Sequence, residues 1–137
     1  DTYVTLMREL REMLDRIEAD TGRSMKLTSA VSADPDKIGL IDYLAASQYM
    51  DQIFLMAYDY YGAWSNDVLG HQTPLHNSDA QPDPNFNASA GVDALLAQGV
   101  DPSKIVLGAA MYGRGWKGVS DYGSDTPFHG TASGATD

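Results

Sequence analysis

The sequence contains no cysteine among its 137 residues, and only 9 lysines and arginines against 19 aspartates and glutamates. The lack of cysteine excludes a disulfide framework, thiolate-bound zinc and a cysteine nucleophile. A formal net charge of −10 argues against a nucleic-acid partner, because the phosphates would be repelled. No apolar run approaches the roughly 20 residues of a transmembrane helix, so we expect no membrane partner.

Several active-site signatures are also missing. There is no Gly-x-Ser-x-Gly elbow of a serine hydrolase. His71 and His76 stand five apart in a proline-containing stretch, which is not a metal-ligand spacing, so no metal site is expected. The segment 113–118 matches Gly-x-Gly-x-x-Gly, but no helix follows it and Trp116 would crowd a phosphate. We therefore expect no nucleotide and no other cofactor.

The length and the first residues bound the domain organisation. A chain of 137 residues is too short for a complete (β/α)₈ barrel, which needs about 250 residues. The sequence starts at Asp1, without a methionine or a charged-then-apolar leader, and enters a helical pattern directly. We interpret it as an internal piece of a longer protein.

Hydrophobic periodicity predicts alternating helices and strands, which is typical of an α/β fold with a parallel sheet. Strand 53–58 is almost continuously apolar, and we expect it to be buried on both faces. One apolar stripe marks the first helix, formed by Leu6, Leu10, Met13, Leu14 and Ile17. The expected order is helix 2–21, strand 25–31, a turn at 34–36, helix 38–47, strand 53–58, a long loop 66–87, helix 88–98, strand 104–111 and an aperiodic tail from 117.

Chemically rich segments follow the two strongest strands. Residues 56–64 read Met-Ala-Tyr-Asp-Tyr-Tyr-Gly-Ala-Trp, and residues 112–116 read Tyr-Gly-Arg-Gly-Trp. The carboxyl ends of parallel strands meet at one edge of a sheet, where α/β proteins build their sites, so we expect both segments to face one pocket.

The middle of the chain is acidic and aromatic. Between Lys37 and Lys104 there are eight aspartates and no lysine or arginine. Aromatic faces stack on sugar rings, and a carboxylate with phenols can hydrogen-bond the hydroxyls of a sugar. The alternative is that the aromatic residues belong to the core, that Asp59 caps a turn, and that Arg114 forms a purely structural ion pair with Asp59.

Three motifs resemble family 18 glycoside hydrolases, and most closely the bacterial chitinases of the chitinase A type. They are Ile-Phe-Leu-Met-Ala-Tyr-Asp-Tyr-Tyr-Gly-Ala-Trp (53–64), Gly-His-Gln-Thr (70–73) and Gly-Ala-Ala-Met-Tyr-Gly-Arg-Gly-Trp (108–116). The resemblance implies cleavage of β-1,4 N-acetylglucosamine linkages in chitin with retention of configuration. The acetamido oxygen of the substrate would be the nucleophile, an exception to the usual two-carboxylate scheme.

The same resemblance implies roles for individual residues. Tyr58 and Asp59 would be catalytic: Tyr58 would orient the acetamido group, and Asp59 would contact the same sugar and set the electrostatics around the acid. The residues implied to bind substrate are Met56, Trp64, Phe86, Met111, Tyr112 and Arg114, of which Trp64 and Phe86 would be aromatic platforms.

The resemblance also implies that this chain is a fragment of a (β/α)₈ TIM barrel. Residues 1–116 would cover about strands five to seven of the catalytic barrel, and residues 117–137 would begin the small α+β insertion domain. The family motif Asp-x-x-Asp-x-Asp-x-Glu, whose glutamate is the general acid, has no match here. We therefore expect a secreted bacterial chitinase as the parent protein and no activity from the isolated chain.

An alternative is a non-catalytic, chitin-binding barrel of the same family that lost the acid and kept the groove. In either case the partners would be chitin and N-acetylglucosamine oligomers. An isolated piece of barrel leaves two sheet edges open, so we expect the chain to need the remainder of the barrel for a stable fold.

Overall fold

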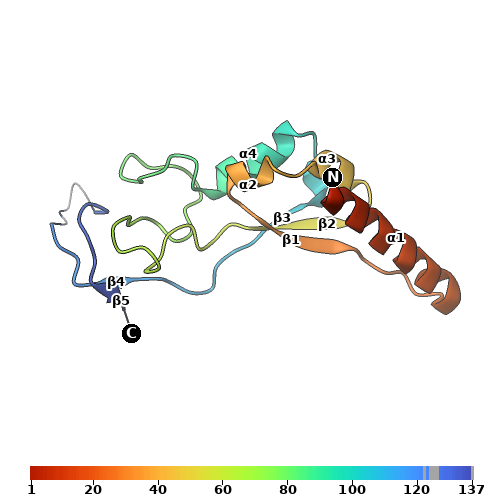
Figure 1. Cartoon of the computed structure of the whole chain (residues 1–137), viewed down its shortest axis with the longest axis horizontal. Helices are drawn as coiled ribbons and strands as arrows, with labels where there is room; N and C mark the ends of the chain where they lie inside the picture. Colours follow the sequence, from red (N-terminus) through yellow and green to blue (C-terminus); the bar gives the residue numbers. More distant parts are fainter. Residues whose placement is uncertain (122, 124–126, 137) are drawn as a thin grey trace.

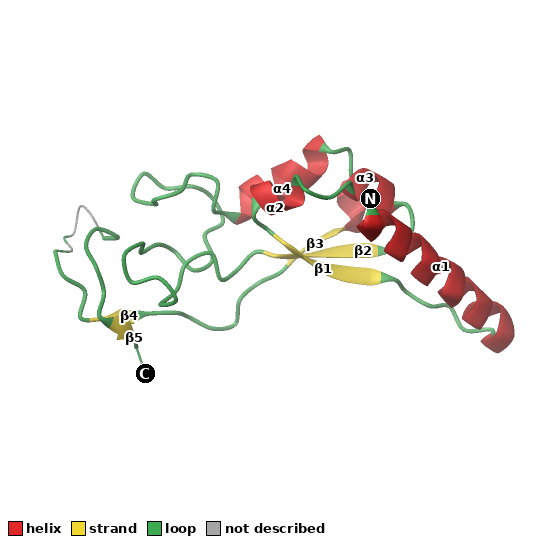
Figure 2. Cartoon of the chain, viewed as in Figure 1, coloured by secondary structure: helices red, strands yellow, loops and turns green. Residues whose placement is uncertain are grey.

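The computed structural model describes residues 1–121, 123 and 127–136. Three parallel strands form one sheet in the order β1-β2-β3, and helices lie on one side of it (Figures 1 and 2). The elements are α1 (Thr2–Thr21), β1 (Thr28–Ser32), α2 (Pro35–Ile38), α3 (Tyr43–Ser47), β2 (Gln52–Met56), α4 (Ala88–Ala97), the 3₁₀ helix η1 (Pro102–Lys104), β3 (Ile105–Leu107), β4 (Trp116–Lys117) and β5 (Gly134–Ala135).

The parallel sheet confirms the α/β prediction. Strand β2 lies in the centre, with Ile53 opposite Ser29 of β1 and Ile105 of β3. All three strands therefore run in the same direction, and the segments that follow them leave the sheet at one edge. Figure 1 shows the segments after β2 and β3 extending away from the helices as long loops toward the β4–β5 ladder, whereas the segment after β1 leads directly into α2.

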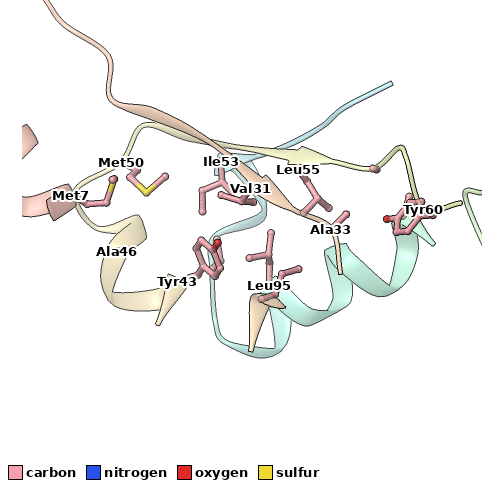
Figure 3. Close-up of a cluster of buried hydrophobic side chains, with 14 of the residues drawn as sticks. Met7, Val31, Ala33, Tyr43, Ala46, Met50, Ile53, Leu55, Tyr60 and Leu95 are labelled. Atoms are coloured by element: carbon pink, nitrogen blue, oxygen red, sulfur yellow. The ribbon is translucent and has the colours of Figure 1, made fainter. Parts of the chain in front are cut away.

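The prediction that strand 53–58 is buried on both faces was wrong. In β2, Ile53 and Leu55 are fully buried, whereas Phe54 is 38% exposed and Met56 is 36% exposed. Side chains alternate across a strand, so one face of the sheet packs on helices and the other has no cover in the described part of the chain. Figure 3 shows Ile53, Leu55, Val31 and Leu95 gathered on the helix-covered side.

The predicted helix 38–47 is helical only at Ile38, the last residue of α2, and over α3, while most of α2 lies in the predicted turn at 34–36. Asp34 caps α2 by accepting a hydrogen bond from the Asp36 amide, and Pro35 occupies the first helical position, where its missing N–H costs nothing. Asp42 starts α3 in the same way, through the Ala45 amide. These two caps explain why the helices begin at residues 35 and 43 and not at 38.

All three strands of the parallel sheet are shorter than predicted, and β2 ends at Met56 instead of Tyr58. Strand β1 begins at Thr28 because the Met25 amide donates to Glu18 and the Leu27 amide donates to Asp51, so these amides are bonded to side chains. Strand β3 covers only Ile105–Leu107 of the predicted 104–111. Helix 88–98 is confirmed as α4, and residues 66–87 form a long loop, also as predicted.

The apolar stripe of α1 is less buried than expected. Met7, which is not part of the predicted stripe, is the buried residue, while Leu6, Met13 and Ile17 are exposed. Leu10 and Leu14 pack partly on the core. Figure 1 shows why: the C-terminal half of α1 extends beyond the sheet.

The tail begins with a short ladder rather than an aperiodic stretch. Trp116 pairs with Ala135, and Lys117 pairs with Gly134, in antiparallel register. The expectation that an insertion domain starts at 117 includes positions 122, 124–126 and 137, which lie outside the described residues. Among the helices that are described, none is long and apolar enough to cross a membrane.

Candidate functional site

Five of the predicted site residues line one pocket at the carboxyl edge of the sheet. Its volume is about 230 Å³, and it opens where β1 and β2 end. Ser32, Ala33, Asp34 and Lys37 come from the β1 side. From the segment after β2 and from the long loop come Met56, Tyr58, Asp59, Tyr60, Trp64 and Phe86. The structure thus brings together residues 56 and 86 from 30 positions apart, as a common substrate site requires.

Asp59 has an unusual backbone conformation at this edge. Its φ is 61°, in the left-handed region that aspartate tolerates better than most residues. Its Oδ1 lies 2.5 Å from Arg114 Nε, which confirms the partner predicted from sequence. Two loops that follow neighbouring strands are therefore tied together by one ion pair.

The ion pair also shifts the pKa values of Asp59 and Arg114 so that both groups stay charged. The Arg114 hydrogen bond, with a smaller contribution from the Tyr112 hydroxyl, holds the pKa of Asp59 below its ordinary value despite partial desolvation. Asp59 raises the pKa of Arg114 in turn. Both side chains are more than a third exposed, so water screens their attraction. Asp59 is a carboxylate at neutral pH, an acceptor for a hydroxyl or amide of a ligand and not a proton donor.

The Arg114 guanidinium lies between two aromatic rings. Its Cζ is 4.9 Å from the centre of the Trp64 ring and 5.5 Å from that of Tyr112, within cation–π range of both. Tyr112 in turn packs edge-on against Tyr58, with ring centres 6.2 Å apart. A chain of contacts therefore runs from Trp64 through Arg114 and Tyr112 to Tyr58.

The Gly70–Thr73 motif holds the loops in place, a role that sequence reasoning did not assign to it. Gln72 accepts a hydrogen bond from the Tyr60 amide, and its own Nε2 donates to the Tyr112 carbonyl oxygen at 3.3 Å. Thr73 Oγ1 donates to the Ala57 carbonyl oxygen at 2.7 Å. The motif thus joins the segments after β2 and β3 by hydrogen bonds, which no periodicity could have revealed.

Phe86 sits deeper than a groove platform would. Its ring packs against Tyr60 and Tyr61, with centres 5.8 and 5.6 Å away, and it is partly buried in the core. The expectation that aromatic residues here belong to the core holds for Tyr60 and Tyr61, which are buried. Phe86 therefore belongs to both the core and the pocket wall.

Met111 lies apart from the other site residues. Its side chain is 96% exposed, and it lines neither the pocket above nor the larger one beside Arg114. This second pocket, of about 400 Å³, is lined by Tyr112, Gly113, Arg114 and residues of the loop 71–78.

Two polar features of the long loop have structural explanations. Asn87, at the end of this loop, is buried and caps α4 by accepting a hydrogen bond from the Ala90 amide. His71 packs edge-on against Phe128, with ring centres 4.6 Å apart. Across the described part of the chain, no three histidine, aspartate or glutamate side chains gather as metal ligands would.

Comparison with known proteins assigns the chain. The model of the glycosyl hydrolases family 18 matches residues 1–136. The chain belongs to family 18 of the glycosyl hydrolases. A chitinase of Autographa californica nuclear polyhedrosis virus is 51% identical over 133 residues, which cover 97% of this chain and 24% of the viral protein. Chitinase A of Pseudoalteromonas piscicida is 48% identical over 142 residues, covering 91% of this chain and 17% of that protein.

Solved structures agree with this assignment. A family 18 chitinase from Cycas revoluta in complex with (GlcNAc)3 has a TM-score of 0.78 and 26% identity, covering 98% of this chain and 38% of that one. The resemblance to family 18 and to chitinase A noted in the sequence is confirmed. The chain spans about a quarter or less of the length of the two curated relatives it matches.

Proposed function

We propose that this chain forms part of the catalytic barrel of a chitinase that hydrolyses β-1,4 N-acetylglucosamine linkages. The observation that carries the proposal is the pocket at the strand ends, where Tyr58, Asp59 and Trp64 lie together with Met56 and Phe86. Relatives at 51% and 48% identity are named chitinases, which supports catalysis over the chitin-binding alternative.

In this proposal Tyr58 and Asp59 act on the acetamido group of one sugar. The Tyr58 hydroxyl would donate a hydrogen bond to that group and hold its carbonyl oxygen close to the anomeric carbon. This oxygen would then be the nucleophile that attacks the anomeric carbon, and the configuration would be retained. Asp59, kept ionised by Arg114, would stabilise the positive charge that develops on the acetamido nitrogen. Trp64, 60% exposed, would stack on a neighbouring sugar ring.

The general acid would come from outside these 137 residues. The three glutamates all lie on α1; Glu9 and Glu12 are exposed, and Glu18 is engaged by Arg11 and the Met25 amide. The uncovered face of the sheet, with Phe54 and Met56, would turn toward the interior of a (β/α)₈ barrel whose remaining strands cover it. We further propose that this segment contributes about strands five to seven, and that residues 117–137 begin an insertion domain.

The proposal extends to partners and location. The partners would be chitin and its oligomers, for which the (GlcNAc)3 complex of the Cycas relative is a precedent. Secretion from a bacterium is proposed on the resemblance to bacterial chitinases.

The test is hydrolysis of chitohexaose by the full-length protein that carries this chain, compared with Y58F and D59N variants. We expect each variant to lose at least about 100-fold in kcat, the scale of losing one oriented or electrostatic group in a transition state. As a control, E9Q changes an exposed side chain on α1 that lines neither pocket, and it should retain full activity.

Three outcomes would contradict the proposal. Wild-type activity in both variants would remove Tyr58 and Asp59 from catalysis. Turnover by the isolated 137-residue chain, abolished by D59N, would show that no external acid is needed. Binding of chitohexaose without any hydrolysis by the full-length protein would favour the chitin-binding alternative.

A further inference from the structure

Gly62 lies beneath the Trp64 side chain, at a position to which no role has been assigned. A Cβ atom added to Gly62 would overlap Cζ3 of the Trp64 ring, lie 2.5 Å from Cη2 and come within 2.8 Å of Arg114 Cδ. Distances below 3.0 Å between such atoms require something to move. The indole of Trp64 therefore occupies the space that any side chain at position 62 would need.

The backbone does not require glycine at this position. The positive-φ residues of the described chain do not include Gly62. Alanine would therefore meet no conformational strain there, and the aromatic ring is the obstacle.

The backbone around Gly62 is fixed from both sides, so the side chain of Trp64 must yield. The Ser65 amide donates to the Gly62 carbonyl oxygen at 3.1 Å, closing a turn over residues 62–65. The Trp116 indole N–H donates to the Ser65 carbonyl oxygen at 2.9 Å and anchors that turn to β4. The far edge of the Trp64 ring is the part free to swing, because that side chain is largely exposed.

Arg114 contacts the Trp64 ring and stabilises it in its position over Gly62. Its guanidinium lies 4.9 Å from the Trp64 ring centre, while its Nε is held by Asp59 at 2.5 Å. The cation–π contact and the ion pair share one side chain, so the ring position depends on both. The Trp64 ring packs against Arg114, and it also occupies the space that a side chain at position 62 would fill.

We propose that Gly62 is a specificity-determining residue, which, together with Arg114, positions Trp64 as a platform for a sugar ring. This inference rests on the proposed chitinase function for its ligand, and on the structure alone for the position of the ring. A side chain at 62 displaces Trp64 from the pocket wall and removes one stacking surface. The protein then binds short oligomers as before and loses affinity for those long enough to reach Trp64.

The experiment uses the full-length protein and N-acetylglucosamine oligomers of two to six units. We expect G62A to weaken binding of the longest oligomer about tenfold, as W64A does, since one stacking contact is lost. We expect no change for the shortest oligomer that binds. G113A is the matched control: an added Cβ there has no atom within 4 Å, and its φ is not positive.

A double variant separates displacement of the ring from a general disturbance of the loop. W64F removes the distal ring atoms that a Cβ at 62 would meet and leaves only its 2.8 Å approach to Arg114 Cδ, so G62A should cost much less when added to W64F than in the wild type. If G62A binds the longest oligomer as tightly as the wild type, or if its effect simply adds to that of W64F, the proposal is wrong. Poor folding of G62A that W64F restores would support it.

A ligand-free measurement separates this inference from the proposed function. The ring current of the Trp64 indole, whose centre lies 4.9 Å from Arg114 Cζ, should shift the Arg114 Nε–H NMR signal. G62A should remove this contribution and leave that of the Tyr112 ring, whereas G113A should keep both, even if no oligomer binds the wild type. An unchanged signal in G62A would overturn the positioning role, whereas absence of wild-type binding alone would overturn only the proposed function.

Discussion

The helix-covered sheet and the site loops are stabilised in different ways. In the sheet layer, Ile53, Leu55 and Leu95 are fully buried, and they pack in a continuous apolar cluster. In the loops after β2 and β3, single contacts between distant residues hold the chain, such as Asp59 with Arg114. Burial therefore organises the first region, and specific polar and aromatic contacts organise the second.

Buried polar atoms show the same contrast. Within the described residues, four buried side-chain atoms lack a hydrogen-bond partner in the protein: Tyr60 Oη, Gln72 Oε1, Ser78 Oγ and Gln81 Oε1. All four belong to the loop region, and none to the helices or the parallel sheet. An unpaired buried polar group costs free energy, and natural proteins keep such groups where a site needs them. The loop region is therefore less optimised for stability than the sheet layer.

The largest expected effect on stability comes from the sheet layer. Leu55→Ala leaves a cavity at the centre of the cluster and should reduce the free energy of unfolding by about 2–5 kcal/mol. Phe54→Ala, one position along on the uncovered face, should cost less than Leu55→Ala, since its side chain is 38% exposed whereas that of Leu55 is fully buried. Urea unfolding of both variants measures the difference, and equal losses would show that the two faces are packed alike.

A smaller effect is expected where the sheet layer depends on charge. Asp51 accepts hydrogen bonds from the Leu27 amide at 2.8 Å and from Lys26 Nζ at 2.9 Å, and it lies 3.6 Å from Arg11. These contacts, the Leu27 bond foremost, hold its pKa below the ordinary value. We expect Asp51→Asn to cost about 1–3 kcal/mol at pH 7.

The pH dependence of this effect has a fixed sign. A carboxyl whose pKa is lower in the folded state stabilises the protein above its unfolded pKa, near 3.9. That contribution disappears as the pH falls through the lower, folded-state pKa. Unfolding curves of wild type and Asp51→Asn should therefore differ most at neutral pH and converge in acid. A difference that does not shrink in acid would exclude this role for the charge.

The smallest stability effect is expected in the loops. Asp59→Asn removes an ion pair whose two side chains are more than a third exposed, so the free energy of unfolding should change by less than about 1 kcal/mol. Oligosaccharide binding and hydrolysis by the full-length protein should nevertheless fall sharply. A stability loss as large as that of Leu55→Ala would show that Asp59 is a structural residue.

The sequence predicted which helices and parallel strands form the sheet layer better than it predicted their boundaries and burial. Periodicity located α1 and α4 and identified parallel strands, because these features follow from spacing along the chain. It extended α3 back to residue 38, since Asp42 resembles an ordinary polar position until its bond to the Ala45 amide is known. It overestimated burial of 53–58, because an apolar run does not reveal whether both faces are covered in the same chain.

The sequence predicted which residues belong to the candidate site better than it predicted how they contact one another. The motifs at 53–64 and 108–116 identified Asp59 and Arg114, and the structure confirms their pairing. The bridging role of Gln72 and the contact between Gly62 and Trp64 depend on how loops fold over one another, which no local pattern encodes. Met111 was included on the resemblance alone, and its side chain is 96% exposed in this chain, so its role in binding substrate stays a prediction.

The most direct test of the account is a crystal structure of the full-length protein with a bound N-acetylglucosamine oligomer. The account predicts the acetamido group of one sugar within hydrogen-bond distance of the Tyr58 hydroxyl and of Asp59, with a neighbouring ring stacked on Trp64. An oligomer bound away from the edge of the sheet where β1 and β2 end, with these three side chains uncontacted, would contradict it.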